Sequence, residues 1–94
     1  MHVAHKYKIL MEDFLNNLIS VDEFENRYLD TFKTETVQMD DQLFQILNTA
    51  FESVDCYWKG CQEGEETPFV ISEQQLRKEV SEVLVELKDI IDGA

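Results

Sequence analysis

Four stretches of the chain repeat their hydrophobic residues at steps of three and four positions, which is the period of an amphipathic α-helix. The repeats predict helices over residues 4–18, 21–33, 41–59 and 72–91. The apolar stripe of the first stretch consists of Tyr7, Leu10, Met11, Phe14, Leu15 and Leu18. The stripe of the third consists of Leu43, Phe44, Leu47, Ala50, Phe51, Val54 and Trp58.

Helix-start signals stand in front of two of these stretches. Ser20 is followed by Glu23, and Ser72 is followed by Gln75. This spacing is typical of a capping box, in which the serine accepts from the third backbone N–H and the third side chain reaches back. Both pairs predict a helix that begins directly after the serine.

The third stretch has less definite boundaries. Asp40 or Asp41 could cap its start, and Gly60 is expected to end it in a left-handed conformation. The apolar run at 69–71 could form a short strand, but the sequence shows no second strand to pair with it. We interpret it as a hydrophobic staple that leads into the last helix.

Four amphipathic helices with short connections predict an all-α protein, a compact and mostly antiparallel four-helix bundle with up-down-up-down topology. A chain of 94 residues has room for one core, so we expect a single helical domain over residues 1–94. Glycine and proline number only three and one, too few for a turn-rich β-sandwich or barrel.

The formal net charge of −12 narrows the classes of partner. Such a chain should repel nucleic acids and anionic membrane surfaces and attract basic proteins, in a salt-dependent way. The simpler alternative is that the charge only keeps a small protein in solution. No stretch approaches the length of a membrane span, and the N-terminus lacks the features of a secretory signal. We therefore expect a cytoplasmic protein with free thiols.

Few residues are suited to catalysis or metal binding. The two histidines, His2 and His5, lie near the N-terminus, where chains tend to fray. Cys56 and Cys61 form a C-x4-C pair, whereas a structural zinc site needs four ligands, usually in two close pairs. We expect no catalytic residue, no metal and no cofactor.

The stretch VDCYWKGCQEGEE, residues 54–66, combines aromatic side chains with carboxylates. Interface hot spots are enriched in Trp and Tyr and surrounded by a polar rim, so this stretch predicts a protein-binding surface. The alternative is a pair of core aromatics followed by a solvated loop. The candidate binding residues are Glu52, Asp55, Tyr57, Trp58, Glu63, Glu65 and Glu66.

Several segments, in order along nearly the whole chain, resemble the colicin D immunity-like family. The run ISVDEFENRY at 19–28 resembles its second helix, and LFQIL at 43–47 resembles its third. VDCY at 54–57 is similar to the aspartate-bearing end of that helix, and ISEQQLR at 71–77 is similar to the opening of the last.

The resemblance implies a small cytoplasmic bacterial protein that neutralises a toxin of a colicin or contact-dependent inhibition system. It implies a one-to-one complex in which an acidic surface covers the active site of a basic nuclease domain, one that cleaves tRNA, and a monomer when free. The family's acidic third-helix end corresponds to Asp55, with Glu52 one turn earlier. The loop that follows does not align with the family, so Glu63, Glu65 and Glu66 are chosen for their charge and position.

Two other functions compete with this one. The first is an acidic helical adaptor or regulator that binds a different basic protein. The second is a small enzyme or metal protein that uses Cys56 and Cys61. A folded sample that contains no metal would exclude the metal-binding version of the second.

Overall fold

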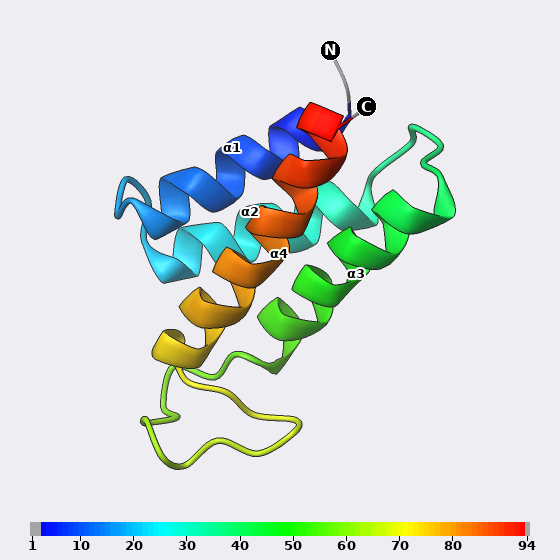
Figure 1. The fold of residues 1–94 in the computed structure, drawn as a ribbon. Coiled ribbons are helices and arrows are strands. Elements are labelled where there is room, and N and C mark those ends of the chain that lie inside the picture. Colours follow the sequence, from blue (N-terminus) through cyan, green and yellow to red (C-terminus); the bar gives the residue numbers. More distant parts are fainter. Residues whose placement is uncertain (1–2, 94) are drawn as a thin grey trace.

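The computed structural model describes residues 3–93, which form four helices: α1 (Ala4–Leu15), α2 (Val21–Lys33), α3 (Asp41–Cys56) and α4 (Glu73–Gly93) (Figure 1). Consecutive helices run in opposite directions. Each helix packs mainly against two others: α1 and α3 both lie against α2 and against α4. The predicted all-α four-helix bundle is confirmed.

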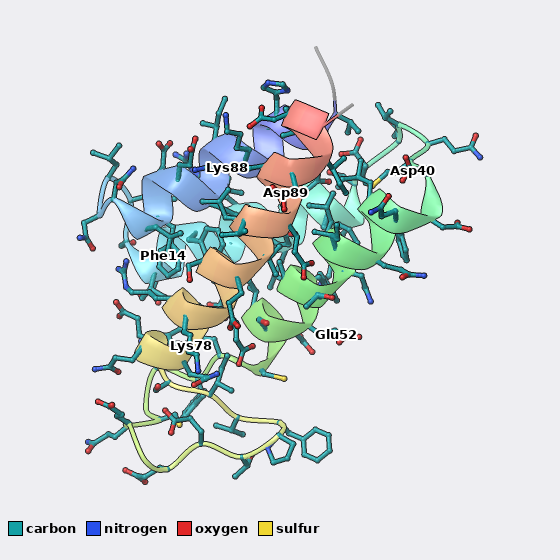
Figure 2. All side chains as sticks on the ribbon, in the orientation of Figure 1. Phe14, Asp40, Glu52, Lys78, Lys88 and Asp89 are labelled. Atoms are coloured by element: carbon teal, nitrogen blue, oxygen red, sulfur yellow. The ribbon has the colours of Figure 1, made fainter. Side chains whose placement is uncertain are left out.

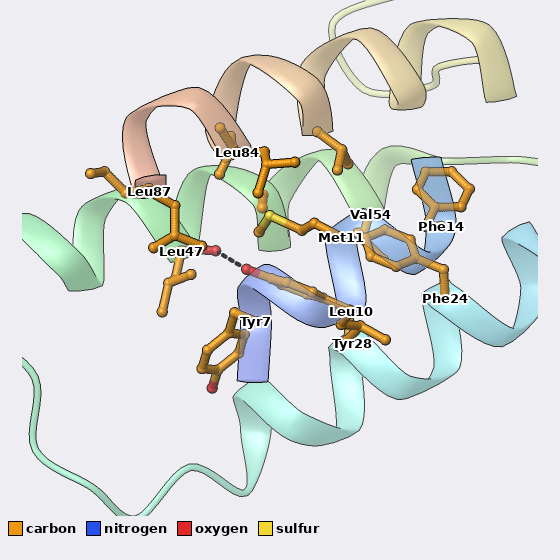
Figure 3. Packing of buried hydrophobic residues seen from close by; sticks show 14 of the residues in the cluster. Tyr7, Leu10, Met11, Phe14, Phe24, Tyr28, Leu47, Val54, Leu84 and Leu87 are labelled. Carbon is orange, nitrogen blue, oxygen red and sulfur yellow. Dashed lines mark hydrogen bonds between the residues drawn. The ribbon is translucent and has the colours of Figure 1, made fainter. Parts of the chain in front are cut away.

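Aromatic rings pack the interface between α1 and α2 and extend toward α3 (Figure 3). The rings of Phe14 and Phe24 stack with their centroids 4.2 Å apart. The Tyr28 hydroxyl, which is fully buried, donates to the Leu47 carbonyl oxygen at 2.8 Å. That bond joins α2 to α3 and satisfies a polar group that would otherwise be costly to bury.

Half of each predicted capping box forms. The Ser20 hydroxyl oxygen accepts from the Glu23 backbone N–H at 3.1 Å, and Ser72 accepts from the Gln75 N–H at 3.2 Å. The reciprocal side chains turn elsewhere: the Glu23 carboxylate pairs with Arg27, and the Gln75 amide binds a carboxylate one turn further along α4. Both helices nevertheless begin directly after the serine, as predicted.

Helix α1 is shorter than predicted. It ends at Leu15 rather than at residue 18, because Asn17 takes a left-handed conformation with φ of 62° and turns the chain. Asparagine tolerates this region better than most residues. Leu18 therefore leaves the apolar stripe and is 71% exposed.

Helix α3 also ends early, at Cys56 rather than at residue 59. Tyr57 is extended, and Gly60 does not have the left-handed conformation expected of it. The physical reason is pairing with a distant segment: the Ile71 N–H donates to the Cys56 carbonyl at 2.9 Å, and the Trp58 N–H donates to the Ile71 carbonyl at 3.2 Å. The 69–71 run thus finds a partner that the sequence did not reveal.

The remaining boundaries are close to those expected. Asp40, not Asp41, caps α3, since its carboxylate accepts from the Leu43 N–H at 2.8 Å. None of the helices between residues 3 and 93 is both long and apolar enough to cross a membrane.

Candidate partner-binding cleft at the end of α3

The extended backbone after α3 sends its two aromatic side chains in opposite directions. On an extended chain successive side chains point to opposite faces, whereas on a helix they would differ by only about 100°. Tyr57 accordingly packs against the core, and Trp58 is 62% exposed. One aromatic therefore packs against the core and the other faces outward, so Trp58 does not belong to the buried stripe in which the sequence placed it.

Trp58 borders a shallow cleft of about 330 Å³ between α2 and the end of α3. The first turns of α2 supply its acidic side, and the residues just after α3 supply its aromatic side. We call it the acid–aromatic cleft. It is lined by Asp22, Glu25, Asn26, Tyr57, Trp58 and Lys59.

The carboxylates around the acid–aromatic cleft repel one another. Burial raises the pKa of Glu25, and the negative charges of Asp22 and Asp55 raise it further, against the opposing effect of Lys59. Burial also raises the pKa of Tyr57, and the negative charges of nearby carboxylates raise it further. A cation entering the cleft would relieve this repulsion, so the cleft favours a positively charged ligand.

The structure brings only part of the predicted surface together. Tyr57 and Trp58 line the cleft, and Asp55 lies close enough for its charge to raise the pKa of Glu25. Glu52 lies on the outer side of α3 and accepts a hydrogen bond from the Asn48 side chain at 3.3 Å (Figure 2).

The three glutamates of the loop between α3 and α4 differ from one another. Glu63 and Glu65 are exposed, and the cleft lining does not include them. Glu66 is turned inward: one carboxylate oxygen accepts from the Ser72 hydroxyl and the other from the Gly64 N–H at 2.8 Å. These hydrogen bonds lower the pKa of Glu66. Glu66 therefore ties the loop to the start of α4, a role that the sequence did not indicate.

Replacing Glu66 with glutamine should loosen this loop without unfolding the bundle. In glutamine an amide NH2 replaces one of the two carboxylate oxygens, so only one of the two acceptor positions that these donors use remains. We expect the Gly64 amide to exchange its hydrogen about tenfold faster, since loop openings are local events. Glu65→Gln is the matched control and should leave that rate unchanged. Equal rates in the Glu66→Gln and wild-type proteins would contradict this role.

Sequence reasoning did not select Asp22, Glu25 and Asn26 as binding residues. Their spacing places them on one face of α2, since residues three and four apart are neighbours on a helix. The polar face was thus visible in the sequence. The sequence did not show that this face lies next to the end of α3.

Other acidic positions are less suited to a partner. A larger hollow of about 760 Å³ lies between α3 and α4, with Gln45 on one side and Glu86 and Asp89 on the other, but its lining contains no aromatic residue. Glu35 accepts from Lys6 at 2.6 Å and from the Tyr7 hydroxyl at 2.7 Å. Its carboxylate is therefore already used within the fold.

The two cysteines show no sign of chemical activation. Both are free thiols. Burial raises the pKa of each thiol, and the negative charges of nearby carboxylates raise it further. A raised pKa leaves the thiol protonated and weakly nucleophilic. Within residues 3–93 no group of three or more His, Cys, Asp or Glu is arranged to hold a metal ion. His2, one of the histidines considered as a ligand, lies outside the described residues.

Comparison with known proteins gives one result that bears on function. The family described as bacterial self-protective colicin-like immunity matches residues 1–87, a range that includes every residue of the acid–aromatic cleft. No curated protein and no solved structure matches the chain.

Proposed function

Because the chain belongs to the family of bacterial self-protective colicin-like immunity proteins, we propose that its toxin is a basic nuclease and that the acid–aromatic cleft binds it. Proteins of this family inhibit a cognate toxin and are not enzymes, so the chain is an immunity protein that acts by binding. The nature of the toxin and the surface used are the parts that we propose.

Charge supports a nuclease as the target. A nuclease grips phosphates with basic side chains, and a chain of net charge −12 is complementary to such a site. Carboxylates placed where phosphates would lie can pair with the basic residues of the active site and exclude the substrate. The resemblance to the colicin D immunity-like family supports a ribonuclease that cleaves tRNA.

The observation that carries the choice of surface is the convergence of Asp22 and Glu25 with Tyr57 and Trp58 in one cleft. Long-range attraction toward the carboxylates speeds association, and a desolvated aromatic anchor slows dissociation. An acidic face without aromatics would speed association but would not slow dissociation. We propose a one-to-one complex formed in the cytoplasm by a monomeric helical domain.

Binding to the toxin should depend strongly on salt. We expect the toxin domain encoded beside this gene to co-purify with the protein, and the association rate to fall at least tenfold between about 0.05 M and about 0.5 M salt, where charges are screened. One molar equivalent should stop the toxin from cleaving tRNA in vitro. The absence of a complex at low salt would rule out this function, and a salt-independent rate would rule out electrostatic steering.

A further inference from the structure

The indole of Trp58 occupies the space next to Gly60 where a side chain would otherwise stand. A Cβ atom added to Gly60 would lie 2.5 Å from Trp58 Nε1, 3.2 Å from Cδ1 and 3.3 Å from Cε2. The first distance is far below any normal contact between heavy atoms. The indole can therefore lie in its observed position only because residue 60 has no side chain.

The backbone on either side of the indole is fixed by hydrogen bonds. The Trp58 N–H donates to the Ile71 carbonyl at 3.2 Å, and the Cys61 N–H donates to the Trp58 carbonyl at 2.8 Å. Gly60 itself does not need a left-handed conformation, so alanine is compatible with its backbone. The benefit of glycine at this position is thus the space it leaves for the indole.

We propose that Gly60 is a positioning residue that leaves room for the Trp58 indole to form one wall of the acid–aromatic cleft, and that the cleft receives an arginine side chain of the toxin. This inference rests on the proposed function. A guanidinium is flat, stacks on an aromatic face and donates to carboxylates at its edge, which a lysine ammonium does less well. Asp22 and Glu25 line the same cleft as the indole, so one guanidinium could contact both kinds of group.

The bundle already contains one arginine in a comparable environment. The Arg77 guanidinium lies 4.3 Å from the centroid of the Phe14 ring, while its Nε donates to the Glu73 carboxylate at 2.9 Å. The same side chain also donates to the Phe14 carbonyl. Ring, carboxylate and guanidinium are therefore compatible at close range in this fold.

Access to this rotamer of the indole before binding should benefit affinity. An exposed tryptophan that moves among rotamers loses that freedom when a partner orders it, and the loss weakens the complex. Gly60 lowers this cost because it leaves open the rotamer in which the indole lines the cleft, so the free protein can adopt that rotamer before the toxin binds. The effect of Gly60 should therefore act through Trp58 and be visible in the rate of dissociation.

The test is the Gly60→Ala variant, followed through the indole N–H resonance of the chain's only tryptophan. We expect that resonance to shift in the free protein and the melting temperature to stay within about 2 °C. Dissociation of the toxin domain should become roughly 10- to 100-fold faster. Gly64→Ala is the control for the indole: an added Cβ at Gly64 has no neighbour within 4 Å, so the substitution strains the loop at its φ of 94° without touching the indole, and the resonance should not move.

Repeating Gly60→Ala in a Trp58→Ala background separates positioning from other effects. In that background Gly60→Ala should change the dissociation rate by less than about twofold, because the effects of mutations at coupled residues are not additive. Equal losses in both backgrounds, or an unmoved indole resonance, would overturn the positioning role. A second series changes each arginine of the toxin to lysine. One of these changes should speed dissociation from the wild-type protein but not from the Trp58→Ala variant. If no arginine behaves in this way, the arginine assignment is overturned.

These outcomes are distinct from a failure of the proposed function. If wild-type protein does not bind the toxin domain at all, the proposed function is wrong. If wild-type protein binds and Gly60→Ala binds equally well despite a shifted resonance, only this inference is wrong.

Discussion

Neutralising Asp22, Glu25 and Asp55 together, as Asp22→Asn, Glu25→Gln and Asp55→Asn, should weaken toxin binding by about 100- to 1000-fold. Asp22 and Glu25 line the acid–aromatic cleft, and Asp55 is close enough to raise the pKa of Glu25. Removing three mutually repelling charges should not unfold the bundle. Calorimetric titration of the toxin domain and a thermal melt of the free variant would measure the two effects separately.

The matched control removes three charges from a different face. Glu82, Glu86 and Asp89 are exposed on α4, where Figure 2 labels Asp89. Their neutralisation changes the net charge by the same amount, so it should slow association by only a fewfold and leave dissociation unchanged. Equal losses of affinity in the two triple variants would show that total charge, not the cleft, determines binding.

Replacing Tyr28 with alanine should lower the free energy of unfolding by about 3–5 kcal/mol, within the range for large-to-small changes in a packed core. Tyr28 is fully buried, and its ring centroid lies 5.6 Å from that of Phe24 and 5.7 Å from that of Tyr7. A loss of this size is a large share of the 5–15 kcal/mol typical of a folded domain. Protection against the toxin should weaken because a smaller fraction of the protein is folded.

One further variant separates the hydroxyl of Tyr28 from its ring, and another serves as the control. Tyr28→Phe keeps the ring and removes the bond to the Leu47 carbonyl, so it should cost about 1–2 kcal/mol. Phe69→Ala removes a ring that is largely exposed in the loop before α4 and should change stability by less than about 0.5 kcal/mol. Urea unfolding measured by circular dichroism would report all three. A cost for Tyr28→Phe as large as for Tyr28→Ala would contradict the importance of ring packing.

The sequence predicted the helices well because their signals are local. The hydrophobic period of α2 and its serine cap lie within the same few residues, and both predicted ends of that helix agree with the structure. Helix ends set by distant segments were predicted less well. The end of α3 depends on Ile71, which pairs with Tyr57 from the far side of a long loop.

The candidate site shows the same division. Asp55, Tyr57 and Trp58 could be selected because charge and aromatic type are visible in one stretch. Asp22 and Glu25 were missed because their relation to that stretch depends on how α2 lies against α3. Glu66 was chosen for its charge, but its two hydrogen bonds within the fold became visible only in three dimensions.

The most direct test of the acid–aromatic cleft is an NMR footprint of the toxin domain on the isotope-labelled protein. We predict that the largest shifts on binding fall on the amides of residues 22–26 and 55–60 and on the Trp58 indole N–H. Little change is expected along α4 near Glu86 and Asp89. A footprint centred on the hollow between α3 and α4, with the Trp58 signal unmoved, would contradict the proposed binding surface.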